Sequence, residues 1–522
     1  MVHRTEHGVS TGIVVGEWDV GGDQEDWLTI VSPSPLSRVT RCRRSGRRSV
    51  RGRVGERGRS LEGSGHGPSH PLSGFPEWLP AQRIVEKRAI EIISRTFELH
   101  GFASVATRAV EPLRELLRKG ETSKEVYVLQ RLHADPGAAA GDDDLGLHFD
   151  LTVPFARYVL EHAGHLTFPF KRYQVQPVWR GERPQDGRFR EFYQADIDIV
   201  GDGELPAHYE VDVPLVAAEA LTALAEIGLP PVRVLVNNRV VADAYYRGIG
   251  LPDVPGVLQA VDKLAKIGPD GVGALLRSEL GADDDQVAAC LALADLSGGV
   301  EVVEQVRALA ARYGVTGPEA VDLEVGLASL TALLVQAETR APGVVVADLS
   351  IARGLDYYTG AVYETVLVGH EKLGSICSGG RYDSLATDGS RTFPGVGISI
   401  GLSRVLSRLF SAGLVTASRS VPTAVLVAVT DEDSRAASDA VATRLRARGI
   451  PCDVAPAAAK FGKQIRFADR RGIPFVWFPG ADGEADAVKD IRSGEQVEAD
   501  ADVWTPPEAD LWPRAVPTTT DA

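Results

Sequence analysis

Apolar residues recur at helical spacing shortly after the segment FPEWLP. They lie three or four positions apart, which places them on one face of a helix. These residues are Val85, Ala89, Ile92, Ile93 and Phe97. Pro80 suits a first helical turn and Gly101 supplies a C-terminal stop. The pattern predicts one amphipathic helix that opens the folded part of the chain.

From residue 102 to about residue 228, segments of strand character alternate with polar loops. The segments read VYVLQ, LGLHFDLTVPFARYVL, FKRYQVQPVWR and REFYQADIDIVG. Because few helical spacers separate them, the pattern favours a largely antiparallel sheet over a doubly wound one.

The pattern then switches to helical periodicity from residue 232 to residue 342. Because this block stands between two strand-rich segments, it indicates an inserted helical domain. Strand character resumes from 343 to 415, and a βαβαβ pattern follows from 421 to 510. The last pattern is typical of a separate α/β domain.

Residues 1–72 hold no sustained helical or strand pattern. They are rich first in Arg and then in Gly, Ser and Pro, a composition that cannot form a packed core. Three interpretations are open: a disordered leader, a basic arm that grips RNA, or a translation start further along the chain. The expected organisation is this leader, a sheet domain in two parts at 73–231 and 343–415, a helical insertion at 232–342, an α/β domain at 421–510 and a tail at 511–522.

The composition narrows the class of protein. A chain of 522 residues exceeds what one core usually supports, so we expect two or three domains. The four Cys residues lie far apart and form no metal-ligand spacing, so we expect neither a disulfide framework nor a zinc site. The expected compartment is a reducing cytoplasm. No apolar run approaches the ~18 residues that span a bilayer, and the N-terminus lacks the apolar core of a secretory signal. We therefore expect no membrane association.

The net charge of −15 does not exclude nucleic acid, because binding to phosphates depends on local basic patches. Two such patches stand at 171–190 and 460–471. In the first, RGERPQDGR joins two strands, and its Arg side chains could hold a triphosphate, since a planar guanidinium matches phosphate oxygens. The alternative to a phosphate-binding role is an exposed hairpin whose Arg and Glu side chains form surface ion pairs. The Arg side chains are Arg180, Arg183 and Arg188.

A nucleotide here would be held by arginines, because the sequence has no GxxxxGK[ST] loop that cradles phosphates with its backbone. Arg404 follows a Gly-rich strand in the first turn of a predicted helix. From there it could reach a phosphate or stack on a base.

Acceptor side chains suited to an α-amino group occur in FDLTVP and QADID. They are Asp150, Thr152, Gln194 and Asp198. The segment ARGLDYYTGAVYE adds Tyr357 and Tyr358, whose flat surfaces suit a small planar ring. Polar sheet surface and a hairpin carrying strand aromatics are the competing interpretations. Only the combination of these segments predicts a pocket.

Together these motifs resemble the histidyl-tRNA synthetase family of class II aminoacyl-tRNA synthetases, from roughly residue 71 to residue 507. The resemblance implies an α+β fold: a catalytic domain of mainly antiparallel sheet flanked by helices, an inserted helical domain and a C-terminal α/β anticodon-binding domain. The motifs that carry it are EPLRELLRKG, FDLTVPFARY, FKRYQVQPVWRGERPQDGRFREFYQADIDIVG, VNNR, VDKLAKIG, ARGLDYYTGAVYE, SGGRYD, GVGISIGLSRV and VKDIRSGEQ.

The resemblance also implies roles for individual residues. Arg180 and Arg353 match arginines beside the α-phosphate and are the expected catalytic groups, while Pro112 matches a proline at a homodimer interface. The implied histidine site is Asp150, Thr152, Gln194, Asp198, Tyr357, Tyr358 and Tyr382. The implied ATP contacts are Arg180, Arg188, Arg353 and Arg404. The implied tRNA contacts are Lys460, Lys463, Arg466 and Arg470.

The implied reaction needs no side-chain nucleophile. The histidine carboxylate attacks the α-phosphorus of ATP, pyrophosphate leaves, and a 3′-terminal ribose hydroxyl of tRNA(His) then takes the histidyl group. ATP enters as its Mg²⁺ complex, with no tightly bound cofactor, and no metal ligands of the protein are identified. The alternative is a histidine-sensing regulatory subunit of ATP phosphoribosyltransferase, which would need neither the C-terminal domain nor the phosphate-binding arginines.

The sequence departs from the family pattern near Arg404. Ser403 stands where the family usually has Glu, and FPGVGISIG replaces a more usual VGFAIG. The contacts to ATP at this end therefore stay open.

Overall fold

The structure, a computed structural model, describes residues 71–117, 125–130, 144–352, 358–480 and 484–518, with two short strands further upstream. Those strands, Trp27–Ile30 (β1) and Thr40–Arg43 (β2), pair antiparallel. The rest of the expected leader up to residue 70 lies outside the described residues. The chain divides into two units, Met1–Ser69 and His70–Ala522, and all further elements belong to the second.

A nine-stranded sheet forms the centre of the second unit. Two of its strand pairs are parallel, β11 with β9 and β3 with β7, while the other neighbours are antiparallel, so the predicted sheet type is confirmed. In spatial order the strands are β10 (Ser297–Gly298), β11 (Val345–Asp348), β9 (Val232–Asn238), β12 (Ala361–Leu367), β13 (Cys377–Thr387), β14 (Thr392–Gly401), β8 (Glu191–Val200), β7 (Phe170–Trp179) and β3 (Ala103–Ser104).

Helices cover the apolar face of this sheet. The predicted opening helix is α1 (Pro80–Leu99), and it packs beside α4 (Tyr209–Ala223) over β7 and β8. Val85 and Phe97 of α1 share one core with Ile197 and Ile199 of β8. The alternation of apolar and polar residues along β8 therefore reflects one face buried beneath helices and one face left for polar groups.

Part of the segment predicted as strand is helical. LTVPFARYVL forms α3 (Thr152–His162), and α4 also lies within the range expected to be rich in strands. A short apolar run carries no period that separates a strand from a buried helix, and Pro154 is compatible with a first helical turn. α3 lies on the polar side of the sheet, where Phe155 and Val159 pack against Phe393 of β14.

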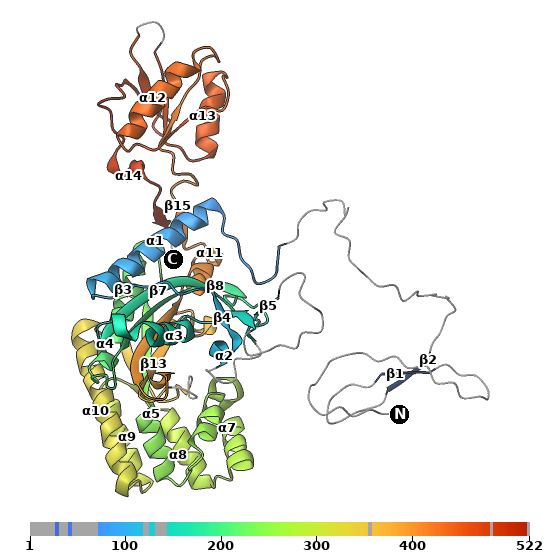
Figure 1. Ribbon diagram of the computed structural model, residues 1–522, viewed down its shortest axis with the longest axis vertical. Helices are drawn as coiled ribbons and strands as arrows, with labels where there is room; N and C mark the ends of the chain where they lie inside the picture. Colours follow the sequence, from blue (N-terminus) through green and yellow to red (C-terminus); the bar gives the residue numbers. More distant parts are fainter. Residues whose placement is uncertain are drawn as a thin grey trace. The chain divides into compact units, whose positions relative to one another are not determined.

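The helical block begins after β9, so the boundary expected at residue 232 moves to residue 239. Its helices gather below the sheet in Figure 1 and share the sheet's hydrophobic core. They are α5 (Arg239–Gly248), α6 (Val254–Val261), α7 (Leu264–Leu280), α8 (Asp284–Ala294), α9 (Glu301–Arg312) and α10 (Gly317–Arg340). Among the described residues α10 alone has the length and composition of a membrane-crossing helix, contrary to the expectation from apolar runs. Its leucines, however, are buried beside α5 and α4, as in a core helix.

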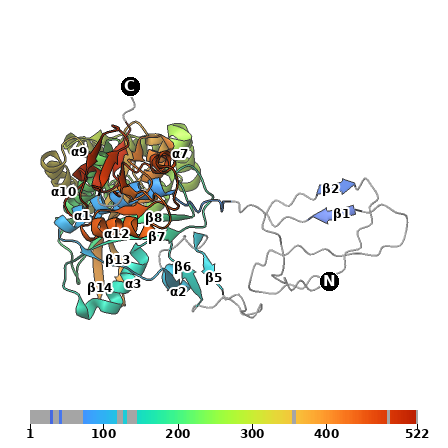
Figure 2. The same cartoon turned by 90° about the horizontal axis from the view of Figure 1, so that it is seen from above.

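A small antiparallel sheet stands apart from the large one and is visible beside α2 (Leu113–Leu116) in Figure 2. Its strands are β4 (Val110–Pro112), β6 (Leu145–Leu147) and β5 (Val128–Leu129), in that order. Pro112 pairs with Leu145, and Leu145 pairs with Leu129. The three side chains therefore form a row across one face of this sheet.

The C-terminal segment has the predicted βαβαβ order. Its elements are β16 (Val425–Val427), α12 (Arg435–Ala447), β17 (Cys452–Val454), α13 (Phe461–Arg470) and β18 (Phe475–Phe478), followed by β19 (Ala487–Asp490) and β20 (Gln496–Glu498). Val425 and Val427 pack with α12, whereas Leu426 packs with residues of α13. Both faces of this sheet are thus covered, as in α/β domains.

The end of the chain is not a simple tail. After α14 (Glu508–Leu511), residues Ala515–Pro517 form β21, which pairs antiparallel with β15 (Val415–Ala417). Arg419 of the linker donates to the carbonyls of Asp510 and Leu511. The entering and leaving linkers of the C-terminal domain are therefore bound to each other. A three-residue strand has no periodicity that the sequence could reveal.

Candidate active site

The polar face of the large sheet follows from the alternation along β8. Ala195, Ile197 and Ile199 point into the core, so their neighbours point to the opposite face. Those neighbours are Gln194, Asp196 and Asp198. Across the register they lie beside Gln176, Gln174 and Arg172 of β7 and beside Gly401, Ser399 and Gly397 of β14. Polar side chains from three strands thus meet on one surface.

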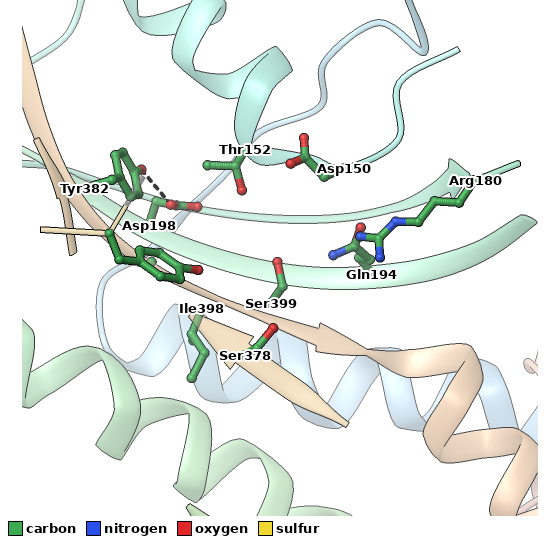
Figure 3. Close-up of a pocket in the computed structure, with 11 residues that line it drawn as sticks. Asp150, Thr152, Arg180, Gln194, Asp198, Ser378, Tyr382, Ile398 and Ser399 are labelled. Carbon is green, nitrogen blue, oxygen red and sulfur yellow. Dashed lines mark hydrogen bonds between the residues drawn. The ribbon is translucent and has the colours of Figure 1, made fainter. Parts of the chain in front are cut away.

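A cavity of about 100 Å³ opens above this surface. Figure 3 shows Asp198 and Tyr382 at one end, Arg180 and Gln194 at the other, and Thr152 at the start of α3. The full lining is Asp150, Thr152, Arg180, Gln194, Asp198, Tyr358, Ser378, Tyr382, Gly397, Ile398 and Ser399. The structure therefore brings together seven predicted site residues from segments far apart in the sequence.

Asp198 is held on both carboxylate oxygens. The Tyr382 hydroxyl donates to Oδ1 at 2.7 Å, and Arg172 Nη2 lies 2.6 Å from Oδ2. Gly397 stands opposite Asp198, and any side chain at this glycine would overlap the carboxylate. The Gly-rich strand β14, which departs from the family pattern, thus leaves room for a buried acid.

Asp150 and Arg180 are fixed around the start of α3. Asp150 Oδ1 accepts from the backbone N–H of Val153 at 3.0 Å, which satisfies one of the free amides of the first helical turn. Arg180 Nε donates to the carbonyl of Phe149 at 3.0 Å, and its guanidinium lies over the ring of Phe192. Both side chains are therefore positioned by the short connection from β6 into α3.

Tyr358 lines the cavity beside Gly380, where the structure leaves no room for a larger side chain. A Cβ at Gly380 would approach the Tyr358 ring to 2.7 Å. Arg353 and Tyr357 lie outside the described residues. The described residues that flank them are held in place: Asn237 donates to the carbonyl of Ile351 at 2.9 Å, and the N–H of Ala361 donates to Glu210 at 2.8 Å.

A larger cavity of about 440 Å³ adjoins the first. The two share Arg180, Gln194, Tyr358, Ser378 and Ser399. Its further lining residues include Glu125, Glu182, Gly187, Arg188, Phe189, Phe192, Glu364 and Arg404. Arg183 is exposed and lines neither cavity.

The arginines of the larger cavity come from two elements. Arg404, in the first turn of α11 (Leu402–Ser411), donates to the carbonyls of Ser375 and Leu373. Arg188 belongs to the β7–β8 hairpin, and its Nη1 lies 3.6 Å from Glu182 Oε2. The Ser403 hydroxyl accepts from the N–H of Tyr193 at 2.9 Å. This serine therefore ties α11 to β8 at the position where the family usually has Glu.

Burial changes the acidity of two carboxyl groups near these cavities. Desolvation raises the pKa of Asp196 to about 7, although the charge of Arg172 opposes it. Burial, followed by repulsion from Glu182, raises the pKa of Glu125. Sequence reasoning missed Asp196, Glu125, Ser378 and Ser399. Alternation along β8 could have identified Asp196, whereas the serines become visible only through the pairing of β13 with β14.

The predicted basic helix is α13, and the four residues predicted to contact tRNA are all exposed. Gln464, on its inner side, is buried and hydrogen-bonds to both the N–H and the carbonyl of Val429. The helix is therefore anchored to the sheet through one polar residue while its cations face outward. The four exposed residues are Lys460, Lys463, Arg466 and Arg470.

Comparison with known proteins agrees with this geometry. Residues 74–405 match the family model for histidyl-tRNA synthetase, and residues 423–502 match that for an anticodon-binding domain. A histidine–tRNA ligase of Cutibacterium acnes is 58% identical over 455 residues, which cover 86% of this chain and 99% of the relative. One from Micrococcus luteus is 58% identical over 460 residues, covering 85% and 97%.

Solved structures show the same fold. A histidyl-tRNA synthetase from Nostoc sp. aligns with a TM-score of 0.73 at 35% identity and covers 84% of this chain and 98% of its own. A Bacillus halodurans protein described as an ATP phosphoribosyltransferase regulatory subunit/histidyl-tRNA synthetase aligns at 0.61 with only 19% identity, which supports the fold alone. The regulatory alternative is not favoured, because relatives described as histidine–tRNA ligases are 58% identical over most of the chain. By its sequence over most of its length and by its fold, the chain belongs to the histidyl-tRNA synthetase family.

Proposed function

We propose that the two adjoining cavities bind histidine and ATP, and that the chain uses them to ligate histidine to tRNA(His). Membership of the family makes the chain an aminoacyl-tRNA ligase. The observation that carries the assignment of the sites is the convergence of seven predicted residues on one cavity. Because the second cavity shares lining residues with the first, an amino acid and a nucleotide bound there would be adjacent.

In the smaller cavity the polar groups suit the two ends of histidine. Asp150, Thr152 and Gln194 offer acceptors for the α-amino group. At the other end, Asp198 and Tyr382 form a hydrogen-bonded pair that suits the N–H of an imidazole. Tyr358, and Tyr357 by its sequence position, would supply aromatic surface for the ring.

Arg180 lines both cavities and is therefore the candidate for the reacting phosphate. The histidine carboxylate attacks the α-phosphorus, the bond to pyrophosphate breaks, and the ribose hydroxyl of tRNA then displaces AMP. Such a transfer depends on positioning and on stabilising negative charge that grows on the phosphoryl oxygens. Arg180 and Arg353 are proposed for that task, and no side-chain nucleophile is required.

Arg188 and Arg404 would hold the remaining parts of ATP in the larger cavity. ATP enters with Mg²⁺ as part of the substrate. Among the described residues, no three acidic, imidazole or thiol groups lie close enough to hold a metal ion by themselves. We infer that phosphate oxygens supply most of the Mg²⁺ ligands, with carboxylates such as Glu182 or Glu364 as the matching protein donors.

Two surfaces are proposed for macromolecular partners. The exposed cations of α13 would contact tRNA phosphates. The row Pro112, Leu145 and Leu129 would meet a second copy of the chain, because both leucines are more than one-third exposed on a flat strand face. We expect this homodimer to work in the cytoplasm.

Amino-acid-dependent exchange of labelled pyrophosphate into ATP tests this function. Histidine alone among the amino acids should stimulate the exchange. Asp198→Asn should raise KM for histidine about 10- to 100-fold, the effect of losing a hydrogen bond to a charged group. Asp202→Asn, which changes an exposed carboxylate just beyond β8, is the matched control. Histidine binding without any exchange would instead favour a sensor.

A further inference from the structure

Arg172 is a buried cation that lies behind the wall of the proposed histidine site. Its side chain is fully buried in β7, and it lines neither cavity. It pairs across the strands with Asp198, which does line the cavity. A buried arginine without a partner would be costly, so its contacts identify the group that it serves.

The contacts of Arg172 converge on the frame of the site. Nη2 lies 2.6 Å from Asp198 Oδ2 and 3.4 Å from the carbonyl of Leu151, which lies between two cavity residues. Nη1 donates to Gln174 Oε1 at 3.3 Å. The guanidinium also lies 4.2 Å from the centroid of the Phe155 ring in α3. One side chain thus joins β7, β8 and the start of α3.

Asp198 needs such a partner. Asp198 is only 2% exposed, and burial favours the neutral form of a carboxyl group. A cation at hydrogen-bond distance favours the ionised form instead. An ionised carboxylate only accepts hydrogen bonds, while a protonated one also donates. The Tyr382 hydroxyl, which donates to Oδ1, fits the ionised form.

We propose that Arg172 is a positioning residue for substrate selection: it keeps Asp198 ionised and aimed into the cavity, so that the carboxylate accepts an N–H from the ring of the amino acid. The inference rests on the proposed histidine site. It predicts that Arg172 contributes to the preference for imidazole over a ring of similar size that lacks an N–H donor. Thiazolylalanine is such a ring.

The test compares histidine with 2-thiazolylalanine in pyrophosphate exchange, using the full-length chain. Arg172→Met should lower kcat/KM for histidine about 10- to 100-fold more than for thiazolylalanine, the worth of a hydrogen bond to a charged group. Arg172→Lys, which keeps the charge, should recover part of the ratio. A general structural defect would lower kcat/KM equally for both substrates, and that result would overturn the proposal.

A double-mutant cycle separates action through Asp198 from an independent role. Adding Arg172→Met to Asp198→Asn should change the ratio less than twofold, because the carboxylate that Arg172 holds is already gone. A further large loss would contradict the proposal. This double variant also removes the uncompensated buried charge, so it remains informative if Arg172→Met alone fails to fold.

Arg157→Met is the matched control. Arg157 is also a buried arginine paired with a buried acid, Glu111, but it lines neither cavity. Its loss should lower stability and leave the ratio unchanged. If the unmodified chain shows no histidine-dependent exchange, the proposed function fails; if it does exchange and the ratio does not respond to Arg172, only the inference fails.

Discussion

Asp196 gives the sharpest prediction about how this site is stabilised. The residue is 1% exposed on the polar face of β8, and neither carboxylate oxygen has a hydrogen-bond partner in the described part of the chain. The Ser399 hydroxyl lies across the strand pair and helps to lower the pKa, without completing a hydrogen bond of good geometry. Burial dominates and raises the pKa from 3.8 to about 7.

The pH dependence follows from the direction of this change. Between pH 4 and pH 7 the folded chain binds a proton at Asp196 that the unfolded chain has released, so stability falls as pH rises through this window. The difference between 3.8 and about 7 corresponds to about 4 kcal/mol at most, at roughly 1.4 kcal/mol per pH unit. Asp196→Asn removes the titration and nearly preserves the shape. Between pH 5 and pH 8 it should gain roughly 3 kcal/mol of stability relative to the unmodified chain.

Urea unfolding at pH 5, 6, 7 and 8 measures this gain. Hydrogen exchange of β7 and β8 peptides should accompany it, because a chain with several domains need not unfold in one step. Asp388→Asn is the control: hydrogen bonds from the N–H of Arg391 and from Ser390 hold the pKa of this exposed acid at about 2. Its contribution to stability should therefore be constant above about pH 5, well above the unfolded pKa of 3.8. Parallel pH profiles for Asp196→Asn and the unmodified chain would refute the reasoning.

Two further predictions concern the proposed macromolecular surfaces. Replacing Lys460, Lys463, Arg466 and Arg470 with Gln should raise KM for tRNA and reduce the salt dependence of binding by about one unit of slope per lost phosphate contact, with pyrophosphate exchange unchanged. Arg444→Gln on α12, where Asp502 pairs with Arg444, is the control, and an equal loss of exchange and charging would count against the tRNA surface. Leu145→Asp, which brings charge to the row on the small sheet, should convert a dimer to monomers in sedimentation velocity. Leu99→Asp at an exposed helix end should not, and a dimer that survives Leu145→Asp would exclude this interface.

The sequence predicted the elements whose patterns are local. The helix α1, the β7–β8 hairpin, the helix α11 with Arg404 in its first turn and the βαβαβ order each depend on the period of a single segment. It failed for α3, because the apolar run after Asp150 fits a strand as well as a buried helix. It also placed the start of the helical block in β9, because β9 runs directly into α5 with no loop to mark the boundary.

Some residues of the candidate site could be predicted from the sequence and others could not. Asp150, Arg180 and Tyr382 lie within recognisable motifs and could be named from the sequence alone. Arg172 could be noticed only as part of a basic patch, and its buried pairing with Asp198 depends on strand register. Register is a property of two strands together, so the reading of one segment at a time could not supply it.

Two glycines near the cavity link the sequence motifs to the geometry of the site. A side chain at Gly397 would overlap the Asp198 carboxylate, and one at Gly380 would press on the Tyr358 ring. Both glycines lie within strands, where glycine weakens pairing and packing. Their place in GVGISIG and SGGRYD is therefore explained by the space that neighbouring side chains need. This sheet gives up local stability at two positions so that an acid and an aromatic ring can reach the same small cavity.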